Sequence, residues 1–297
     1  MTDLTRDAVL GFIGGSGIYE IDGLTNTRWE TVESPFGTPS DQLLFGELDG
    51  QKLVFLPRHG RGHKLNPSGI NYRANIDVMK RCGVTDILAI SAVGSLREDI
   101  APGDFVAVDQ FIDRTVLRER SFFGPGIAAH VGLADPVCPR LSGLAADAAA
   151  QAGANVHRAG CYIAIEGPQF STRAESRMFQ SWGADVIGMT AMPEARLARE
   201  AELPYALLAM VTDFDCWREG EAAVEVGAVL QVMRANAARA RDAVRRLVAA
   251  LPPERAASPI DRALDGAIIT SHEGWNPQQI ARLDAIAGRI LHSTPDE

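Results

Sequence analysis

Two carboxylates separated by a single residue are the most chemically suggestive pair in the sequence. Asp213 and Asp215 follow a short apolar run, and the aromatic residues Phe214 and Trp217 lie beside them. If both carboxyl groups face one pocket, they cannot both ionise at low cost, so one of them should hold a proton. The pair would then offer one donor and one acceptor to a polar heterocycle. The plainer alternative is a helix cap followed by a solvent-facing acid.

A basic loop follows another apolar run. Two arginines and two histidines fall within six residues, in the stretch Arg58-His59-Gly60-Arg61-Gly62-His63. Arginine offers a planar fork that matches phosphate, and histidine adds a further donor. We therefore expect Arg58 and His59 to bind an anion. A solvated basic loop stays open as an alternative. A metal site at His59 and His63 would lack further ligands, because no acid or cysteine is close by in the sequence.

Small and hydroxyl-bearing residues follow the other apolar runs. The turn Gly14-Gly15-Ser16-Gly17 lacks the glycine spacing of a dinucleotide-binding fingerprint, but it can turn backbone N–H groups and a hydroxyl toward an anion. Each signal is weak by itself, because a structural turn or a helix N-cap explains any one of them. Together they predict a site with an anion at one end and a polar heterocycle at the other. The remaining candidates are Ser91 and Ala92, residues 166–173 and residues 188–194.

These residues need a scaffold that gathers the ends of several strands. Short β-rich runs alternate with helical patterns, which favours an α/β fold: a single domain with a central mixed, largely parallel β-sheet flanked by helices. In such sheets ligands bind at the carboxyl ends of the strands. We expect strands at residues 9–13, 43–48, 52–56, 86–91, 105–109, 161–165, 185–188 and 205–212, and helices at 71–81, 141–152, 171–182 and 193–200.

The last part of the chain predicts one long helix and a short extension. Apolar residues recur every three or four positions between residues 226 and 251, and Pro252-Pro253 ends the pattern. Residues 254–258 suggest a linker, and the stretch beyond it is too short for an independent domain. We expect one domain over residues 1–297, with its core at 9–251 and a C-terminal helical extension at 252–297.

Composition excludes several classes of protein. The chain has 297 residues and a formal net charge of −9, from 29 Lys and Arg against 38 Asp and Glu, which argues against a nucleic-acid partner. The four cysteines include no C-x-x-C pair, so neither a zinc site nor a disulfide framework is indicated. The N-terminus lacks a secretory pattern, and no apolar run approaches the roughly 20 residues of a membrane helix. We expect a soluble cytoplasmic protein without a membrane partner.

Several long motifs resemble the nucleoside phosphorylase-I family and occur in the same order along the chain. More narrowly, they are similar to the trimeric branch of that family that acts on methylthioadenosine. The likeness covers residues 9–251, and the C-terminal residues match only loosely. The motifs are GGSGIYE, PRHGRGHKLNPSGINYRANI, SAVGSLREDIAPGDFVAVDQFIDRT, IEGPQFSTRAESRMFQSWGADVIGMTAMPEARLARE and TDFDCW.

The resemblance implies a phosphorolysis. Inorganic phosphate, a co-substrate, attacks C1′ of a purine nucleoside and releases the purine with a ribose 1-phosphate derivative. The family uses no metal and no organic cofactor, and a homotrimer or a dimer of trimers is implied. Carried over motif by motif, the phosphate would lie among Ser16, Arg58, His59, Ser91, Ala92 and Thr190; the ribose against Met189; the base near Phe170 and Ser171, with Asp213 and Asp215 as the catalytic pair; and the 5′ end near His130, Val226, Val229 and Leu230, in part at a subunit interface.

The carboxylate pair also bears on which purine is bound. A protonated Asp213 can donate to N7 of adenine while Asp215 accepts from N6. An ionised Asp215 would face the 6-oxo group of hypoxanthine or guanine unpaired, a mismatch that costs about 10³-fold or more. The residues therefore favour 6-aminopurines. The apolar residues expected at the 5′ end suit a methylthio or methyl group, so 5′-deoxyadenosine is expected as a second substrate beside methylthioadenosine.

One departure from the methylthioadenosine pattern keeps alternatives open. Gly188 precedes Met189, where those enzymes often carry Asn and the 6-oxopurine branch carries Gly. A 6-oxopurine nucleoside or methylthioinosine phosphorylase therefore remains a second reading. A hydrolytic nucleosidase would not need the phosphate cluster around Arg58 and His59. A non-catalytic nucleotide-binding module would bind adenosine without turnover.

Overall fold

One mixed β-sheet dominates the computed structural model, which describes residues 6–15, 17–18, 20–218, 226–252 and 254–292. The sheet contains 11 strands among these residues, and a separate two-stranded sheet pairs residues 6–7 with residues 254–255. The strands are β1 (Arg6–Asp7), β2 (Val9–Gly14), β3 (Thr25–Glu30), β4 (Leu43–Leu48), β5 (Gln51–Pro57), β6 (Asp86–Ser95), β7 (Phe105–Val108), β8 (Gln110–Asp113), β9 (Val156–His157), β10 (Cys161–Ala164), β11 (Val186–Gly188), β12 (Tyr205–Asp213) and β13 (Glu254–Arg255).

The longest strand, β6, is the centre of the sheet. It pairs in parallel with β2 and β12 and antiparallel with β11. On one side the order continues through β2, β5, β4 and β3, and on the other through β11, β10 and β8. Strand β12 pairs in addition with β7, which in turn pairs with β9. Parallel and antiparallel pairs share one sheet, which confirms the expected mixed architecture.

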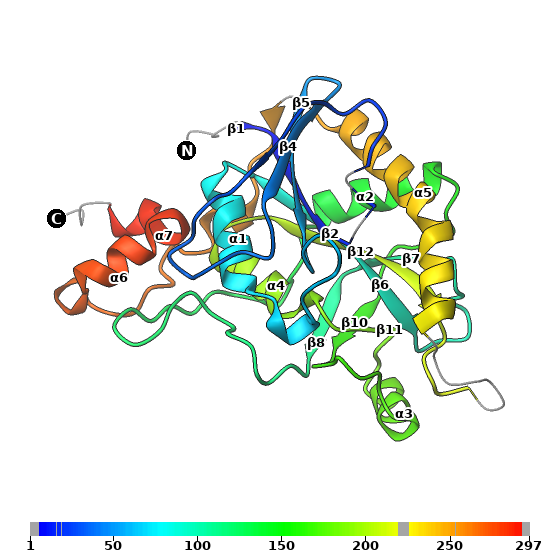
Figure 1. Cartoon of the computed structure of the whole chain (residues 1–297). Coiled ribbons are helices and arrows are strands. Elements are labelled where there is room, and N and C mark those ends of the chain that lie inside the picture. Colours follow the sequence, from blue (N-terminus) through cyan, green and yellow to red (C-terminus); the bar gives the residue numbers. More distant parts are fainter. Residues whose placement is uncertain (1–5, 16, 19, 219–225, 253, 293–297) are drawn as a thin grey trace.

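Helices cover both faces of this sheet. Side chains alternate between the faces along each central strand, so Ile87 and Ala89 of β6 join one core while Leu88 and Ile90 join the other. The first core is closed by α1, α4 and α7, and the second by α2 and α5 (Figure 1). The helices are α1 (Tyr72–Arg81), α2 (Pro139–Gln151), α3 (Arg173–Ser181), α4 (Ala191–Glu200), α5 (Val226–Ala250), α6 (Pro277–Arg282) and α7 (Asp284–Leu291).

The start of α3 settles which hydroxyl caps this helix. Thr172 is the N-cap: its side chain accepts the N–H of Glu175, and the Glu175 carboxylate accepts the N–H of Thr172. The helix therefore begins at Arg173 rather than at Ser171. Ser171 is left outside the capping box, and its hydroxyl is available for another partner.

The C-terminal extension is tied to the body of the molecule at two points. Glu254–Arg255 forms β13, which pairs with β1, so the segment that suggested a linker is hydrogen-bonded to the N-terminus. Arg255 is buried between Asp86 and Asp261. Helices α6 and α7 follow, and α7 packs against α1 on the side of the molecule opposite α5 (Figure 1). The described part of the extension thus begins with a strand and continues into helices.

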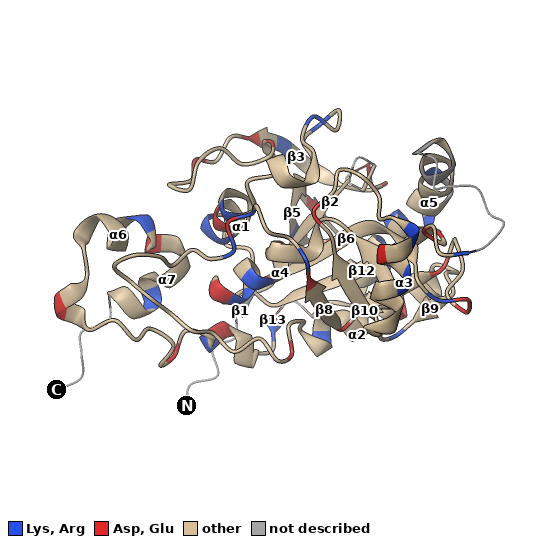
Figure 2. Ribbon diagram, turned by 90° about the horizontal axis from the view of Figure 1, so that it is seen from below, with Lys and Arg blue, Asp and Glu red and all other residues tan. Residues whose placement is uncertain are grey.

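Charged residues of both signs are interspersed over the ribbon in the view of Figure 2. That view gives no face of a single sign. Among the residues described, no helix combines the length and the apolar character needed to cross a bilayer.

Candidate active site

Strand register brings several predicted site residues to one region of the sheet. Asp213, at the end of β12, lies opposite Gly94 of β6, and Gly94 lies opposite Ile187 of β11. A side chain at position 94 would place its Cβ 2.9 Å from Oδ1 of Asp213, so the glycine permits this close approach. At the neighbouring strand ends, Gly14 of β2 pairs with Pro57 of β5. The ends of β2, β5, β11 and β12 therefore converge around the second half of β6.

Arg58 follows β5 and is 2% exposed. Its fork is occupied by Glu194 of α4: Nε donates to Oε2 at 2.8 Å and Nη2 to Oε1 at 2.9 Å. Two further hydrogens reach the carbonyls of Ile90 and Ile13. Burial alone would lower the pKa of Arg58, but the Glu194 carboxylate outweighs it and raises that pKa. Four of the five guanidinium hydrogens are thus bound within the described chain, and one on Nη1 remains for an anion.

His59 lies beside Arg58 with its ring fixed by two contacts. Nδ1 is 2.8 Å from the carbonyl oxygen of Leu65, and the ring stacks on His63 with centroids 4.2 Å apart. Because a carbonyl only accepts, Nδ1 must carry the proton. Burial, with the nearby charge of Arg58, lowers the pKa of His59 to about 4, so the ring is neutral near pH 7 and Nε2 is an acceptor. Among the described residues, no three His, Cys, Asp or Glu side chains gather as metal ligands would.

Two hydroxyls lie together between β6 and β11. Oγ of Ser91 is 3.3 Å from Oγ1 of Thr190, the residue before α4, whose side chain makes no capping hydrogen bond. The backbone N–H of Thr190 donates to the hydroxyl of Tyr162, a buried residue of β10. In the structure the Ser91 hydroxyl donates to the carbonyl of Ala92 at 3.2 Å, and a rotation about its C–O bond would let it join Thr190 in donating to one anion.

Tyr162 also explains the glycine at position 188. A Cβ there would lie 2.1 Å from the Tyr162 hydroxyl oxygen, a distance that no side chain can occupy. The phenol thus fills the space beside the backbone before Met189. Gly188 is required by this packing and has no side chain with which to contact a base.

Asp213 sits in a setting that suits a protonated carboxyl group. Oδ1 accepts the N–H of Asp215 at 2.7 Å, and Oδ2 is 2.7 Å from Oγ1 of Thr212. Thr212 also lies 3.1 Å from the carbonyl of Val93, which can only accept. If the single hydroxyl hydrogen goes to Val93, the threonine oxygen can accept a proton held by Asp213. Burial raises the pKa of Asp213, and the charge of Asp215 adds to that rise.

Asp215 is held by serines from two elements. Its backbone adopts a left-handed conformation, with φ of 52°, which aspartate tolerates better than most residues. Oδ2 accepts the hydroxyl of Ser171 at 2.8 Å and also that of Ser176 on α3. The carboxylate is therefore anchored on one oxygen, which leaves the other as an acceptor. Ser171 contacts Asp215 rather than capping α3.

Met189 and Phe170 lie on the loops that follow β11 and β10. Met189 packs against Gly167, where a Cβ would come 2.4 Å from its sulfur, and its carbonyl accepts from Arg118. Phe170 is 45% exposed although it is a large apolar side chain. An exposed aromatic ring beside the Ser171 and Asp215 contact is free to stack on a flat ligand.

The other predicted residues are one strand residue, two exposed residues and three residues whose side chains the structure does not describe. Ala92 lies in β6 next to Ser91 and pairs with Met210 of β12. His130 is exposed, and its N–H donates to the carbonyl of Ala267 in the C-terminal extension, so its described contacts do not tie it to the strand ends. Leu230 is 43% exposed on α5. Ser16 lies outside the described residues, and for Val226 and Val229 only the backbone of α5 is described.

Sequence reasoning missed several residues that hold this site together. Glu194 was visible only as the acid of the TAMPE stretch, and nothing local indicates its partner 136 residues away. Thr212 ends an apolar run, and nothing local indicates that it contacts the carboxylate pair. Ser176 and Arg118 lie in stretches rich in charged and polar residues, which are typical of a solvated surface. No spacing rule finds Glu194, Ser176 or Arg118, because each contacts its partner across a long separation in sequence.

The chain is similar in sequence and in structure to known proteins. A model of the phosphorylase superfamily matches residues 9–249. The chain is 55% identical to an S-methyl-5′-thioadenosine phosphorylase of Cereibacter sphaeroides, over 95% of this chain and 98% of that one, and 55% identical to one of Rhodospirillum rubrum, over 98% and 100%. A crystal structure of methylthioadenosine phosphorylase from an antarctic soil metagenomic library aligns with a TM-score of 0.89 at 45% identity, covering 95% of this chain and 99% of that chain. The Schistosoma mansoni methylthioadenosine phosphorylase in complex with adenine aligns with a TM-score of 0.76 at 41% identity, covering 82% and 91%.

Proposed function

The chain belongs to the phosphorylase superfamily, and we propose that it cleaves S-methyl-5′-thioadenosine with inorganic phosphate, giving adenine and 5-methylthioribose 1-phosphate. 5′-Deoxyadenosine is a second proposed substrate. The observation that carries the proposal is the carboxylate pair after β12, in which burial raises the pKa of Asp213 beside the anchored Asp215. The names of the relatives support the same substrate.

The phosphate is proposed to bind where the hydroxyls of Ser91 and Thr190 lie 3.3 Å apart, with the remaining Nη1 hydrogen of Arg58 as a third donor. His59 contributes differently, because its Nε2 accepts: it suits the hydroxyl of monohydrogen phosphate or a ribose hydroxyl. A phosphate held under C1′ both attacks that carbon and stabilises the positive charge that develops on the ribosyl group. Ser16 and Ala92 are included on the family resemblance alone.

The purine is proposed to lie against Phe170, with its N6 and N7 edge toward the carboxylate pair and the ribose against Met189. A protonated Asp213 donates to N7 and relieves the charge on the leaving purine. The free oxygen of Asp215 accepts from the 6-amino group, while Ser171 orients the carboxylate. Gly188 takes no part in this choice, because the hydroxyl of Tyr162 accounts for it.

The 5′ end and the assembly are proposed together. We assign Val226, Val229 and Leu230 of α5 to the 5′ methylthio group, and His130 to the site of a neighbouring subunit in a homotrimer or dimer of trimers. The exposure of His130 and the hydrogen bond of its backbone N–H to Ala267 in the C-terminal extension support that role. Val116 and Leu117 are 68% and 79% exposed and give a large apolar surface for a neighbour. The mass of the purified protein by light scattering tests the assembly: a monomer would contradict it.

One comparison tests the purine assignment. Purified protein is given methylthioadenosine or methylthioinosine with inorganic phosphate, and the release of adenine or hypoxanthine is followed. We expect adenine release to be favoured by about 10³-fold in kcat/KM, because Asp215 would face the 6-oxo group unpaired. Faster release of hypoxanthine would contradict the assignment and favour the 6-oxopurine reading.

A further inference from the structure

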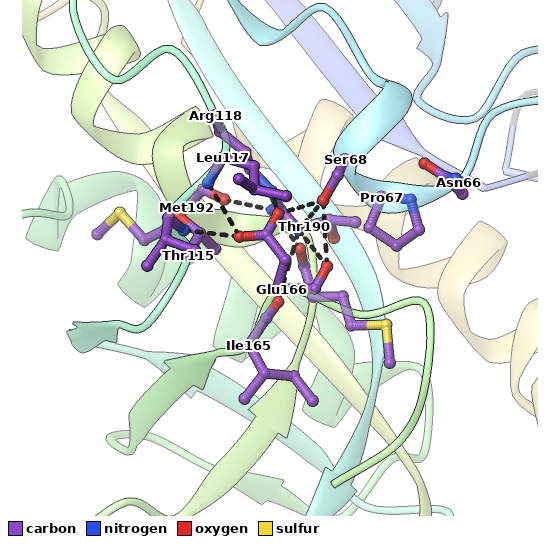
Figure 3. Close-up of polar contacts among 12 residues, drawn as sticks. Asn66, Pro67, Ser68, Thr115, Leu117, Arg118, Ile165, Glu166, Thr190 and Met192 are labelled. Atoms are coloured by element: carbon purple, nitrogen blue, oxygen red, sulfur yellow. Dashed lines mark hydrogen bonds and ion pairs between the residues drawn. The ribbon is translucent and has the colours of Figure 1, made fainter.

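Arg118 is a buried cation that no step proposed above uses. It lies on the segment between β8 and α2, and its side chain is 1% exposed. Its guanidinium group contacts two separate loops (Figure 3). Nη1 donates to the carbonyl oxygens of Met189 at 2.5 Å and Met192 at 2.8 Å, and Nη2 donates to the carbonyl of Glu166 at 2.7 Å. A planar group with a fixed set of donors thus spans the gap between the loops.

These two loops carry the proposed substrate contacts. The loop after β10 contains Glu166 and runs on to Phe170 and Ser171, which are assigned to the purine. The loop after β11 contains Met189 and Thr190, which are assigned to the ribose and phosphate. The distance between purine and phosphate in the bound state therefore depends on how these loops are spaced. Arg118 is hydrogen-bonded to both of them.

Glu166 fixes Arg118 in turn. Its Oε1 lies 3.2 Å from Nε of Arg118 and accepts the hydroxyl of Ser68, while Oε2 accepts the N–H groups of Val116 at 2.6 Å and Leu117 at 3.2 Å. The carboxylate therefore holds the backbone immediately before Arg118. Burial alone would raise the pKa of Glu166, but these hydrogen bonds and the charge of Arg118 outweigh it and lower the pKa to about 2. The carboxylate stays charged at any pH near neutrality.

We propose that Arg118 and Glu166 form a positioning pair that sets the spacing between the purine loop and the phosphate loop. The inference rests on the proposed function, since it concerns how the substrate contacts of that reaction are held. Neither residue touches the reacting atoms. A misplacement of about 1 Å caused by a change away from the chemistry can lower a rate by about 10²-fold. Lysine at position 118 would keep the charge but could not donate to three carbonyls in one plane.

A buried ion pair that only stabilises the fold is the competing explanation, and the chain offers a matched control for it. Arg255 is 3% exposed and pairs with Asp86 and Asp261. Asp86 begins β6, whereas the proposed site gathers at the opposite end of that strand. Replacing a buried arginine by lysine at either place disturbs a comparable ion pair. Only the change at Arg118 lies between the two substrate loops.

The experiment compares wild type with Arg118→Lys, Glu166→Gln and Arg255→Lys in steady-state assays with methylthioadenosine and phosphate. We expect Arg118→Lys to lower kcat/KM by about 10²-fold, chiefly through kcat, when assayed well below its Tm. Glu166→Gln keeps one acceptor oxygen for the Val116 and Leu117 N–H groups but turns an amide NH₂ toward Nε of Arg118. It should give a smaller loss, because the guanidinium group keeps its three carbonyl acceptors. Arg255→Lys should lose thermal stability with kinetic constants unchanged. Equal kinetic constants in Arg118→Lys and Arg255→Lys would overturn the proposal.

Amide hydrogen exchange gives a readout that needs no activity. Peptides covering residues 165–172 and 188–193 should exchange faster in Arg118→Lys and Glu166→Gln than in Arg255→Lys or wild type. Unchanged exchange in both loops would overturn the positioning role. If the wild type itself releases no adenine, the proposed function fails, while the exchange data still decide whether the pair braces the loops. If Arg118→Lys does not fold, the kinetic assay and the hydrogen-exchange measurement are both made on Glu166→Gln.

Discussion

Replacing Asp213 by Asn removes one proton from the proposed reaction and changes little else. Asn keeps the shape of the side chain, and its Oδ1 can still accept the N–H of Asp215, which lies 2.7 Å from Oδ1 of Asp213. Its amide nitrogen can donate to Oγ1 of Thr212 while Thr212 donates to the carbonyl of Val93. Each neighbour therefore keeps a hydrogen-bond partner. The amide can also donate to N7 of adenine, but it cannot transfer a proton.

The size of the effect follows from that difference. A positioned general acid contributes about 10² to 10⁴ in rate. Because Asn retains the neutral hydrogen bond to N7, we expect a loss near the lower end, about 10²-fold in kcat, or about 2.7 kcal/mol in activation free energy. The KM for the nucleoside should change less. Burial raises the pKa of Asp213, and the protonated form is the active one, so wild-type kcat should fall as the pH rises through that pKa, and the variant should lack this limb.

Asp113 provides the matched control for this substitution. It ends β8, its side chain is 1% exposed, and its Oδ1 accepts the N–H of Thr115 two residues on, as Oδ1 of Asp213 does from Asp215. The assay is phosphate-dependent release of adenine from methylthioadenosine across a pH series. Asp113→Asn should keep wild-type kcat. An unchanged kcat in Asp213→Asn, or an equal loss in the two variants, would remove Asp213 as the proton donor.

Two further predictions concern packing and pH. Gly188→Ala would bring a Cβ to 2.1 Å from the Tyr162 hydroxyl, so it should lower the free energy of unfolding by about 1–3 kcal/mol. Adding Tyr162→Leu should recover part of that loss. Chemical denaturation measures both variants, and a Gly188→Ala protein as stable as wild type would contradict the steric explanation. Burial raises the pKa of Glu200 from 4.5 to about 7, so the folded state holds a proton that the unfolded state has lost between these values. The free energy of unfolding should therefore decline as pH rises from about 4.5 to 7, by on the order of 3 kcal/mol from this group. In thermal melts over this pH range, the Tm of Glu200→Gln should change less with pH than that of wild type. An identical change of Tm with pH in both proteins would exclude Glu200 as the source of the decline.

Local sequence signals predicted the elements that are bounded by turns and packed on both faces. Strands are expected at residues 43–48 and 52–56, and the structure confirms both as β4 and β5, which pair antiparallel on either side of Asp49-Gly50. Strand β8 was missed because only Asp109 separates it from β7, and residues 105–109 look like one strand. The chain in fact changes partners there: β7 pairs with β12, and β8 pairs with β10. Strand β3 is polar and lies at the sheet edge, so it carries no burial pattern.

The candidate site was predicted by its chemistry rather than by its contacts. The order of motifs brought forward Arg58 and Asp213, because unusual polar residues at strand ends stand out locally. The sequence could not show that the guanidinium group of Arg58 is hydrogen-bonded to Glu194, since that pair depends on how α4 packs on the sheet. Arg118 was hidden for the same reason: its segment is rich in charge, yet tertiary packing buries it.

In the proposed reaction phosphate, not water, accepts the ribosyl group. The most direct test of this step follows adenine release from methylthioadenosine by purified protein while phosphate is varied from none to saturation, with the sugar product identified by mass spectrometry. We expect no adenine release without phosphate, saturable activation by phosphate, and one 5-methylthioribose 1-phosphate for each adenine formed. Adenine release at an undiminished rate in phosphate-free buffer, with free 5-methylthioribose as the product, would contradict the proposed reaction.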